Sequence, residues 1–438
     1  MLVKKVMKSQ LLTTFSARGI AAGGTFLLSY VLATFVTVQA FGAFMLCLSV
    51  MIGVQVFTSL GTDRATLKFM GIATSNGNKK EVKWIYQRSM FVNILVGCLF
   101  SILLWFFAPA IAQMLFSSVE NGVDSLKITA VISPLYSVIY LCNFLMKGWG
   151  RANVSCFFEI GCISIILSFL VVLGSLFDYE FSALELILAL GCILFFYLLL
   201  AVWYVIKIYK DCRFVSLEKV SFSKSFYKSL PDFLLVGIIF YYTQWGAGIV
   251  LGFFHDESDV AIFSLGLRLA MIIGFILTVY DSILGPRFSR LQHENDHKSL
   301  RELAQKSAFQ MTCVAFLPAA LFLVWPEAVL GLFGSDYDGA SSVLRILVVA
   351  QLINVMTGSI ILLLLMAGEQ KSARNILIWS VVIGGLASLL LIPMYNANGA
   401  ALSLLLCLLI QNVVALYVVN KKFGFLVIDW REAVKFNS

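Results

Sequence analysis

Twelve apolar segments follow one another along the chain, and each is about long enough to cross a lipid bilayer. A helix of about 20 residues, rising ~1.5 Å per residue, spans the roughly 30 Å hydrocarbon core. With 60% hydrophobic and only 13% charged residues, the chain has more apolar surface than a soluble protein of this size can bury. The sequence therefore predicts an all-α polytopic membrane protein with about twelve transmembrane helices. Polar residues, glycine or proline bound the segments, which we place near 11–36, 41–60, 89–108, 126–146, 152–176, 184–206, 231–254, 260–287, 307–324, 344–367, 373–393 and 399–419.

The first segment has some features of a signal peptide, because lysines precede it and Val38-Gln39-Ala40 follows it. Its apolar run is about 26 residues long, well beyond the roughly 7–15 residues of a signal peptide, and it contains Arg18. We therefore interpret it as the first spanning helix.

The basic residues predict the orientation of these helices. With the N-terminus placed in the cytoplasm, all Lys and Arg residues except Arg18, Lys127, Arg268 and Arg345 fall in cytoplasmic segments. The C-terminus is then cytoplasmic as well. The net charge of +8 is explained by contact with anionic lipid of the cytoplasmic leaflet, and a nucleic-acid partner is not indicated.

The two halves of the chain repeat each other. Gln87-Arg88-Ser89 returns as Gln305-Lys306-Ser307, and Leu126-Lys127-Ile128 returns as Leu344-Arg345-Ile346, both at the same offset of about half the chain. Each half contains six spans, an even number, so the repeat is parallel and a substrate site is expected between the halves. The predicted organisation is an N-terminal six-helix lobe (1–206), a cytoplasmic linker (207–230), a C-terminal six-helix lobe (231–420) and a cytoplasmic tail (421–438).

Two arginines lie inside predicted spans. Arg268 is about 12 Å from the end of its helix, where a charge costs at least ~2.5–3.5 kcal/mol on insertion scales. Either it faces a cavity and binds a phosphate with its bidentate fork, or it pairs with an acid on a neighbouring helix. Arg18 is about 10 Å from the inner end of the first helix, where it either binds substrate or snorkels to the headgroups.

Other polar residues are weaker candidates. Glu159 and Asp281 lie within or near spans and either couple an ion or form structural salt bridges. Lys127 and Arg345 are related by the repeat and either form the rim of an exit or anchor the helices at the interface. Asp63-Arg64 ends the second span, and we interpret this pair as a local contact.

The aromatic sequence Tyr241-Tyr242-x-x-Trp245 either stacks on sugar rings or packs against other helices. No nucleophile elbow, Walker loop or metal-spaced His/Cys set is present, so an enzyme is not predicted and neither a cofactor nor a metal is expected. Energy would then come from an H+ or Na+ gradient or from the gradient of the substrate.

Four stretches point to a family: ARGIAAGGTFLLSYVLATFVTVQAFGAF (17–44), SLGTDRATLKF (59–69), the run 231–290 ending near SILGPRFSRL, and LLLLMAGEQKSARN (362–375). In these the chain resembles the polysaccharide flippases of the multidrug/oligosaccharidyl-lipid/polysaccharide (MOP) exporter superfamily, especially O-antigen translocases. The resemblance implies two MATE-like lobes forming a V around a cavity with alternating access. Related lipid II flippases place arginines in that cavity on helices one and eight, which correspond to the helices of Arg18 and Arg268.

The resemblance also implies a function. We expect a flippase in the bacterial inner membrane that moves an undecaprenyl-diphosphate-linked oligosaccharide to the outer leaflet, in contact with membrane lipid and with a polymerase and chain-length regulator as partners. Alternatives are a cation-coupled multidrug exporter of the same fold, a polymerase, or a scaffold of glycan assembly. An exporter would require acids on helix one or seven, and only Asp232 is there. A polymerase would require a large outer loop, and all of the predicted outer loops are short.

Overall fold

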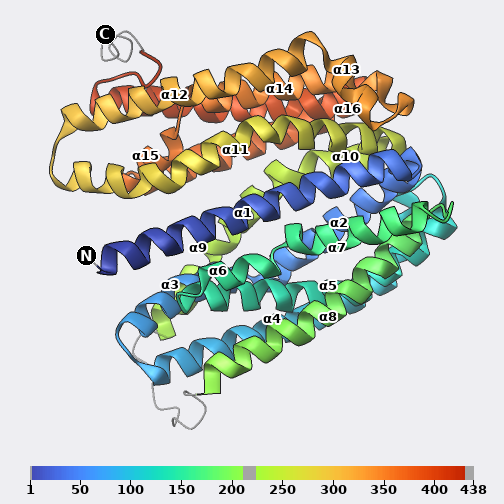
Figure 1. Cartoon of the computed structure of the whole chain (residues 1–438), viewed down its shortest axis with the longest axis horizontal. Coiled ribbons are helices and arrows are strands. Elements are labelled where there is room, and N and C mark those ends of the chain that lie inside the picture. The colour runs from blue at the N-terminus through green and yellow to red at the C-terminus, as the bar shows by residue number, and fades with distance from the viewer. Residues whose placement is uncertain (1, 211–222, 430–438) are drawn as a thin grey trace. The chain divides into compact units, whose positions relative to one another are not determined.

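The computed structural model describes residues 2–210 and 223–429, and these residues form helices joined by short connections (Figure 1). Nine helices are long and apolar enough to cross a membrane within this described part. Two shorter apolar helices, Gly19–Phe35 and Ile160–Ser175, add to them. One of the nine, Gln370–Phe423, contains two predicted spans, so all twelve predicted segments are helical for most of their length. The prediction of a polytopic all-α membrane protein is confirmed.

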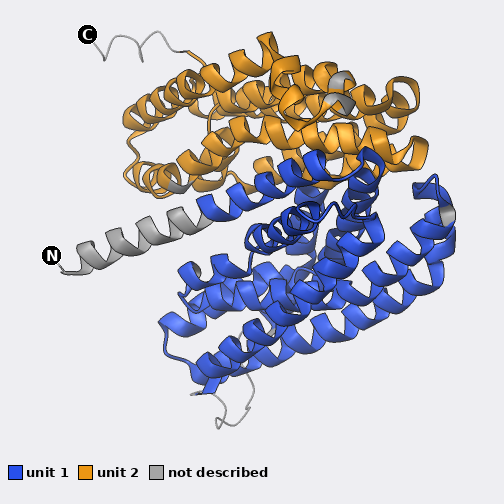
Figure 2. Ribbon diagram, turned by 45° about the vertical axis from the view of Figure 1, so that its right-hand side comes forward, with its two compact units in different colours: residues 1–241 blue, residues 242–438 orange. Residues whose placement is uncertain are grey.

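The chain divides into two compact units, Met1–Tyr241 and Tyr242–Ser438 (Figure 2). In unit 1, α5 packs against α2, α3, α4 and α8, and α1 packs along α7. The helices of unit 1 are α1 (Leu2–Phe35), α2 (Val38–Ser59), α3 (Thr62–Ser75), α4 (Lys79–Leu115), α5 (Val119–Gly148), α6 (Ala152–Ser155), η1 (Cys156–Phe158), α7 (Ile160–Ser175), α8 (Ala183–Tyr209) and α9 (Ser223–Tyr241).

In unit 2, α14 packs against α11, α12 and α16, as its repeat counterpart α5 does among the helices of unit 1. Helices α4 and α12 begin at Lys79 and His297, which are separated by the same offset as Leu126 and Leu344, as the sequence repeat predicts. The helices of unit 2 are the π-helical turn η3 (Tyr242–Gly246), α10 (Ala247–Phe254), α11 (Glu257–His293), α12 (His297–Val324), α13 (Pro326–Leu330), η4 (Gly331–Phe333), η5 (Ser335–Ala340), α14 (Ser341–Met356), α15 (Ile360–Met366) and α16 (Gln370–Phe423).

The division between the units falls inside the predicted seventh span, beyond the predicted linker at 207–230. Residues 211–222 of that linker lie outside the described part of the chain. The first part of the span, α9, packs against α2 and α3 and therefore belongs to unit 1. The contact is close, because Gly61, at φ 80°, leaves no room for a Cβ beside the Leu230 carbonyl oxygen and the Leu234 nitrogen.

Several helix boundaries differ from the sequence prediction. The residues between the predicted second and third spans include the helix α3, because Leu60 and Gly61 adopt left-handed conformations that end α2 and let a new helix begin. Helix α4 continues past Pro109 to Leu115, although the sequence predicts a stop at Pro109. The fifth span is broken, since Glu159 is extended between η1 and α7. The tenth span is also broken, at Gly358, which has a φ of 68°.

Helices α1 and α7 approach each other through small residues. A Cβ on Gly161 would lie 1.7 Å from the Ala21 carbonyl oxygen, and a Cβ on Gly24 would lie 2.1 Å from the Gly161 carbonyl oxygen. Small residues at such crossings let two backbones come together inside a membrane protein. This contact holds the shorter helix α7 in unit 1.

Candidate functional site

Arg268 lies on α11, within the span Glu257–Asp281. The guanidinium carbon is 5.0 Å from the centre of the Trp245 ring, a cation–π contact. Among the described residues, no carboxylate lies within ion-pair distance of this guanidinium. An aromatic face attracts the cation without neutralising its charge, so no carboxylate of the described residues balances the charge of Arg268.

The π-helical turn η3 carries Trp245 to this position. One π turn shifts the direction of the side chains after it, and such turns often occur at functional sites. At its start, the Tyr242 hydroxyl is 2.8 Å from Ser388 Oγ, which donates in turn to Ser403 Oγ at 2.9 Å. Gly384 and Gly385 on α16 lie against the Tyr242 ring. Tyr242 therefore fixes the turn against α16 and thereby positions Trp245.

The three aromatic side chains of the predicted sugar-stacking set have different environments. Tyr241 donates a hydrogen bond to the Ser49 carbonyl oxygen at 2.9 Å, inside unit 1. Tyr242 is bound to Ser388 in unit 2, and Trp245 lies over Arg268. Both tyrosine hydroxyls are hydrogen-bonded within the protein, which favours a packing role for Tyr241 and Tyr242. Trp245, which lies beside the charge of Arg268, stays a candidate for stacking on a sugar ring.

Arg18 lies in α1, and its side chain is outside the described part of the structure. A role for Arg18 in binding substrate stays a prediction. Snorkelling would tolerate Arg18→Lys, whereas bidentate phosphate binding would not.

Glu159 has an ionic partner. Its Oε1 is 2.9 Å from Lys147 Nζ, and it is the last extended residue before α7 begins. Lys147 Nζ also lies 5.2 Å from the centre of the Phe144 ring. Glu159 therefore joins the end of α5 to the start of α7, an arrangement that a structural salt bridge explains.

Reversing the charges of this pair tests that explanation. We expect Glu159→Lys to lower the free energy of unfolding by about 1 kcal/mol or somewhat more, because both side chains are partly buried. A lower melting temperature would report this loss. The double variant Lys147→Glu/Glu159→Lys should recover most of that loss and should transport normally. If the double variant folds well but does not transport, Glu159 has a role in ion coupling.

Asp281 is at the other end of α11 from Arg268, and the described structure does not pair the two. The structural salt bridge predicted as the alternative is not formed, since no cationic group of the described residues pairs with Asp281. Its Oδ1 is buried and has no hydrogen-bond partner within the described ranges. Ion coupling by Asp281 stays a prediction that this geometry favours.

The repeat-related residues Lys127 and Arg345 both have local partners. Lys127 Nζ is 5.8 Å from the centre of the Trp105 ring. Arg345 Nη2 is 3.3 Å from Glu327 Oε1, and its Nε donates to the Leu323 carbonyl oxygen at 3.2 Å. These contacts favour anchoring at the helix ends over an exit rim.

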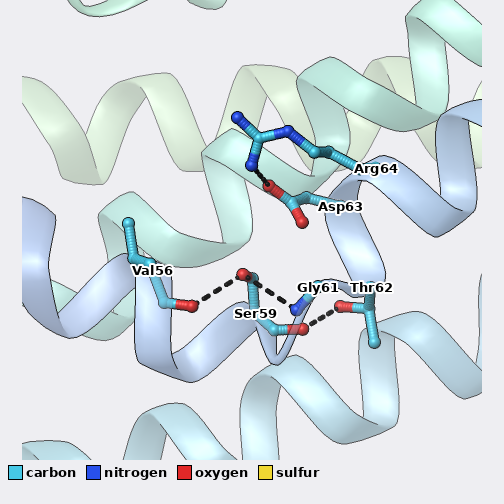
Figure 3. Close-up of polar contacts among 6 residues, drawn as sticks. All are labelled: Val56, Ser59, Gly61, Thr62, Asp63 and Arg64. Atoms are coloured by element: carbon cyan, nitrogen blue, oxygen red, sulfur yellow. Dashed lines mark hydrogen bonds and ion pairs between the residues drawn. The ribbon is translucent and has the colours of Figure 1, made fainter. Parts of the chain in front are cut away.

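A buried polar cluster surrounds the turn between α2 and α3 (Figure 3). Asp63 is only 3% exposed, and its Oδ2 is 3.9 Å from Arg64 Nη1. The Arg64 guanidinium also lies 5.3 Å from the centre of the Phe240 ring on α9. The local pairing expected from the sequence is present, but its burial was not evident from Asp63-Arg64 alone, because it depends on the packing of α5 and α9.

The stability of unit 1 should depend on pH through Asp63. Burial raises the pKa of the Asp63 carboxyl, and the neighbouring Arg64 opposes that rise. The folded protein therefore binds this proton more tightly than the unfolded chain, whose aspartate pKa is about 3.9. The protonated Asp63 carboxyl therefore contributes fully to the free energy of unfolding below the unfolded pKa. That contribution is lost as the pH rises through the higher pKa of the folded state.

We accordingly expect the melting temperature of the wild type to fall, relative to that of Asp63→Asn, as the pH is raised from about 4 to about 8. Asp124→Asn, which removes an exposed carboxylate of the same unit, is the control and should run parallel to the wild type. Parallel curves for Asp63→Asn and the wild type would contradict the prediction.

Comparison with known proteins gives consistent results. A family model described as "Polysaccharide biosynthesis protein" matches residues 9–292, and the MatE model matches residues 235–390. No curated protein sequence matches the chain significantly.

Among solved structures, an inward-facing multidrug resistance MATE transporter of the MOP superfamily matches with a TM-score of 0.73 at 13% identity, covering 97% of this chain and 100% of the other. The lipid II flippase MurJ, in an inward closed conformation, matches with a TM-score of 0.62 at 12% identity, covering 95% and 89%. An outward-facing multidrug resistance MATE transporter of the same superfamily matches with a TM-score of 0.62 at 16% identity, covering 98% and 97%. At these identities the likeness establishes the fold.

Proposed function

Since the chain belongs to the polysaccharide biosynthesis protein family and has the fold of MOP-superfamily transporters and flippases, we propose that it translocates an undecaprenyl-diphosphate-linked oligosaccharide between the leaflets of the bacterial inner membrane. Such a substrate joins a long apolar chain, a diphosphate and a sugar. Translocation would proceed by alternating access, with a polymerase and a chain-length regulator acting on the product.

The observation that supports this proposal most is the state of Arg268. A membrane protein keeps an arginine within a span, at a cost of at least ~2.5–3.5 kcal/mol, where the charge has a function or a partner. Its neighbour Trp245 covers one face of the guanidinium and supplies no negative charge. The edge with its N–H donors fits two phosphate oxygens. A diphosphate would supply the missing anion, and the indole presents an apolar surface to a sugar.

A multidrug exporter is the second candidate, because the MatE model matches part of the chain and MATE structures share the fold. Such a protein would bind amphipathic cations, and an arginine without a carboxylate partner disfavours a cation nearby. An anionic, diphosphate-containing substrate therefore agrees better than a cationic drug with Arg268 and its surroundings in unit 2.

Deletion of the gene in its native host tests the proposal. Surface glycan should be depleted, and the lipid-linked repeat unit should accumulate on the cytoplasmic leaflet, because assembly would continue without export. Plasmid-borne wild-type protein should reverse both effects. Normal surface glycan together with increased sensitivity to cationic dyes would favour the multidrug exporter instead.

A further inference from the structure

Three polar side chains in the spans of unit 1 are buried away from any hydrogen-bonding group of the protein. Thr58 on α2 and Ser137 on α5 are 0% exposed, and Asn93 on α4 is 2% exposed. Thr58 Oγ1, Asn93 Oδ1 and Ser137 Oγ have no hydrogen-bond partner among the described residues. Burial of a polar atom without a hydrogen bond is costly, and such atoms are bonded to protein or to ordered water in the large majority of cases. Each of the three atoms therefore requires a partner.

The three residues come from helices that meet at one junction. Helices α2, α4 and α5 all contact one another. A Cβ built on Gly97 of α4 would lie 3.2 Å from Thr58 Cγ2 and 3.7 Å from Pro134 Cβ on α5. Asn93 precedes Gly97 by four residues and so lies on the same face of α4, one turn away. Asn93 is therefore on the face of α4 that is turned toward both other helices.

The register of α4 and α5 brings Asn93 and Ser137 to the same level. Ser101 Oγ on α4 donates to the Ala130 carbonyl oxygen on α5 at 2.6 Å. The contact at Gly97 lies one turn before Ser101 on α4 and one turn after Ala130 on α5, so the two helices run antiparallel. One further turn along each helix leads to Asn93 on α4 and to Ser137 on α5. The two side chains are therefore neighbours in the junction.

The hydroxyls of Thr58 and Ser137 differ from other buried hydroxyls of the same helices. A serine or threonine in a helix commonly bonds a carbonyl oxygen of the preceding turn. Ser133 on α5 does so, since its Oγ donates to the Thr129 carbonyl oxygen at 2.6 Å. Thr58 and Ser137 make no such bond within the described ranges, so their hydroxyls are available to a ligand in the junction.

Unit 2 has larger apolar side chains at the equivalent positions. The offset of the internal repeat leads from the three polar residues to Ile276, Met311 and Val355. Met311 and Val355 are fully buried. Each apolar side chain is larger than its polar counterpart and requires no hydrogen bond. The same place in the fold therefore holds less side-chain volume in unit 1, as room for a small polar molecule requires.

We propose that Thr58, Asn93 and Ser137 bind an internal water molecule that joins α4 to α2 and α5. Water both donates and accepts hydrogen bonds, as one amide oxygen and two hydroxyls require. About three protein partners is the usual number for a buried water molecule. The site contains two hydroxyls and an amide and no charged side chain, so a neutral ligand suits it. Because the junction lies within the spans, bulk water does not reach these groups, and the bound molecule is part of the folded structure.

Apolar replacements of similar size test the water site on the full-length protein in detergent, without substrate. Thr58→Val, Asn93→Leu and Ser137→Ala each remove one partner of the water molecule. Each should lower the melting temperature by about 2–4 °C, because the water molecule and the remaining groups lose a hydrogen bond. A triple variant that copies unit 2, Thr58→Ile/Asn93→Met/Ser137→Val, displaces the water molecule together with all of its partners. Its loss should be smaller than the sum of the three single losses.

Ser133→Ala is the matched control for Ser137→Ala. Both serines are fully buried on α5, but the Ser133 hydroxyl bonds only its own helix, so this variant should change the melting temperature less. If no ligand bound in the junction, each of the three apolar replacements would remove a buried group that has no partner. The single variants would then be as stable as the wild type or more stable, with additive effects, and this result would overturn the inference.

A density map of the wild type that shows ordered water molecules decides the question even where a variant folds poorly. The expected result is a density peak within about 3.2 Å of Asn93 Oδ1 and of at least one of the hydroxyls of Thr58 and Ser137. A map that shows direct hydrogen bonds between these side chains, with no peak among them, would equally overturn the inference.

Discussion

Arg268→Ala is expected to abolish export of the lipid-linked glycan while the protein still folds and reaches the membrane. The guanidinium has a cation–π contact and no carboxylate partner among the described residues, so its removal leaves no buried acid uncompensated. Loss of one partner from a desolvated charge pair with a phosphate costs about 2–5 kcal/mol. That corresponds to roughly a thirtyfold or larger loss of affinity or rate.

Complementation of a deletion strain measures this effect, with surface glycan and membrane protein quantified in the same cells. Arg268→Lys should retain part of the activity, since it keeps the charge and loses the bidentate fork. Arg345→Ala is the matched control, because that arginine is exposed and bound locally to Glu327 in the same unit. Full complementation by Arg268→Ala at normal protein levels would remove Arg268 from the site.

Gly24→Ala is expected to destabilise unit 1 severely, whereas Gly23→Ala should be tolerated. A Cβ at position 24 would lie 2.1 Å from the backbone oxygen of Gly161, and backbone cannot move aside as a flexible side chain can. A Cβ at position 23 would meet no atom within 4 Å. Overpacking typically costs about 1–3 kcal/mol, and we expect a cost of about 3 kcal/mol or more here because two helix backbones must separate.

The amount of monodisperse protein after detergent extraction and its melting temperature check this prediction. The two variants differ by one position and carry the same substitution, so helix propensity and hydrophobicity are matched. Gly161→Ala should behave like Gly24→Ala, because its Cβ would meet the Ala21 carbonyl oxygen. Equal yields and melting temperatures for Gly23→Ala and Gly24→Ala would contradict the close approach of α1 and α7.

The sequence predicts the spans well and their interruptions poorly. Apolar length alone locates all twelve segments, because crossing a bilayer requires a minimum run of apolar residues. The breaks at Glu159 and Gly358 lie inside such runs, and a single polar residue or glycine within a long apolar run does not by itself predict that the helix ends. Glycine at 358 was compatible with a break, but glycine is also common within membrane helices.

The candidate site was predictable in part. The energetic cost of a charge in a span singles out Arg268 from the sequence. Its partner Trp245 could not be derived, because the π-helical turn after Tyr241 shifts the direction of the side chains from that of a regular α-helix. The equivalence of Asp63 and Asp281 could have been found, since the offset of the internal repeat relates them directly. That Asp63 is buried, and that Asp281 is half-buried with its Oδ1 shielded from solvent, required the packed structure.

A translocation assay with purified protein in liposomes tests the central claim most directly. A fluorescent polyprenyl-diphosphate-linked oligosaccharide is placed in both leaflets, and a membrane-impermeant glycosidase reports the fraction that reaches the outside. Wild-type protein should make nearly all of the lipid accessible, Arg268→Ala should leave about half protected, and an analogue without the diphosphate should not be moved. Wild-type liposomes that protect half of the diphosphate lipid, or that move the uncharged analogue equally well, would contradict the claim.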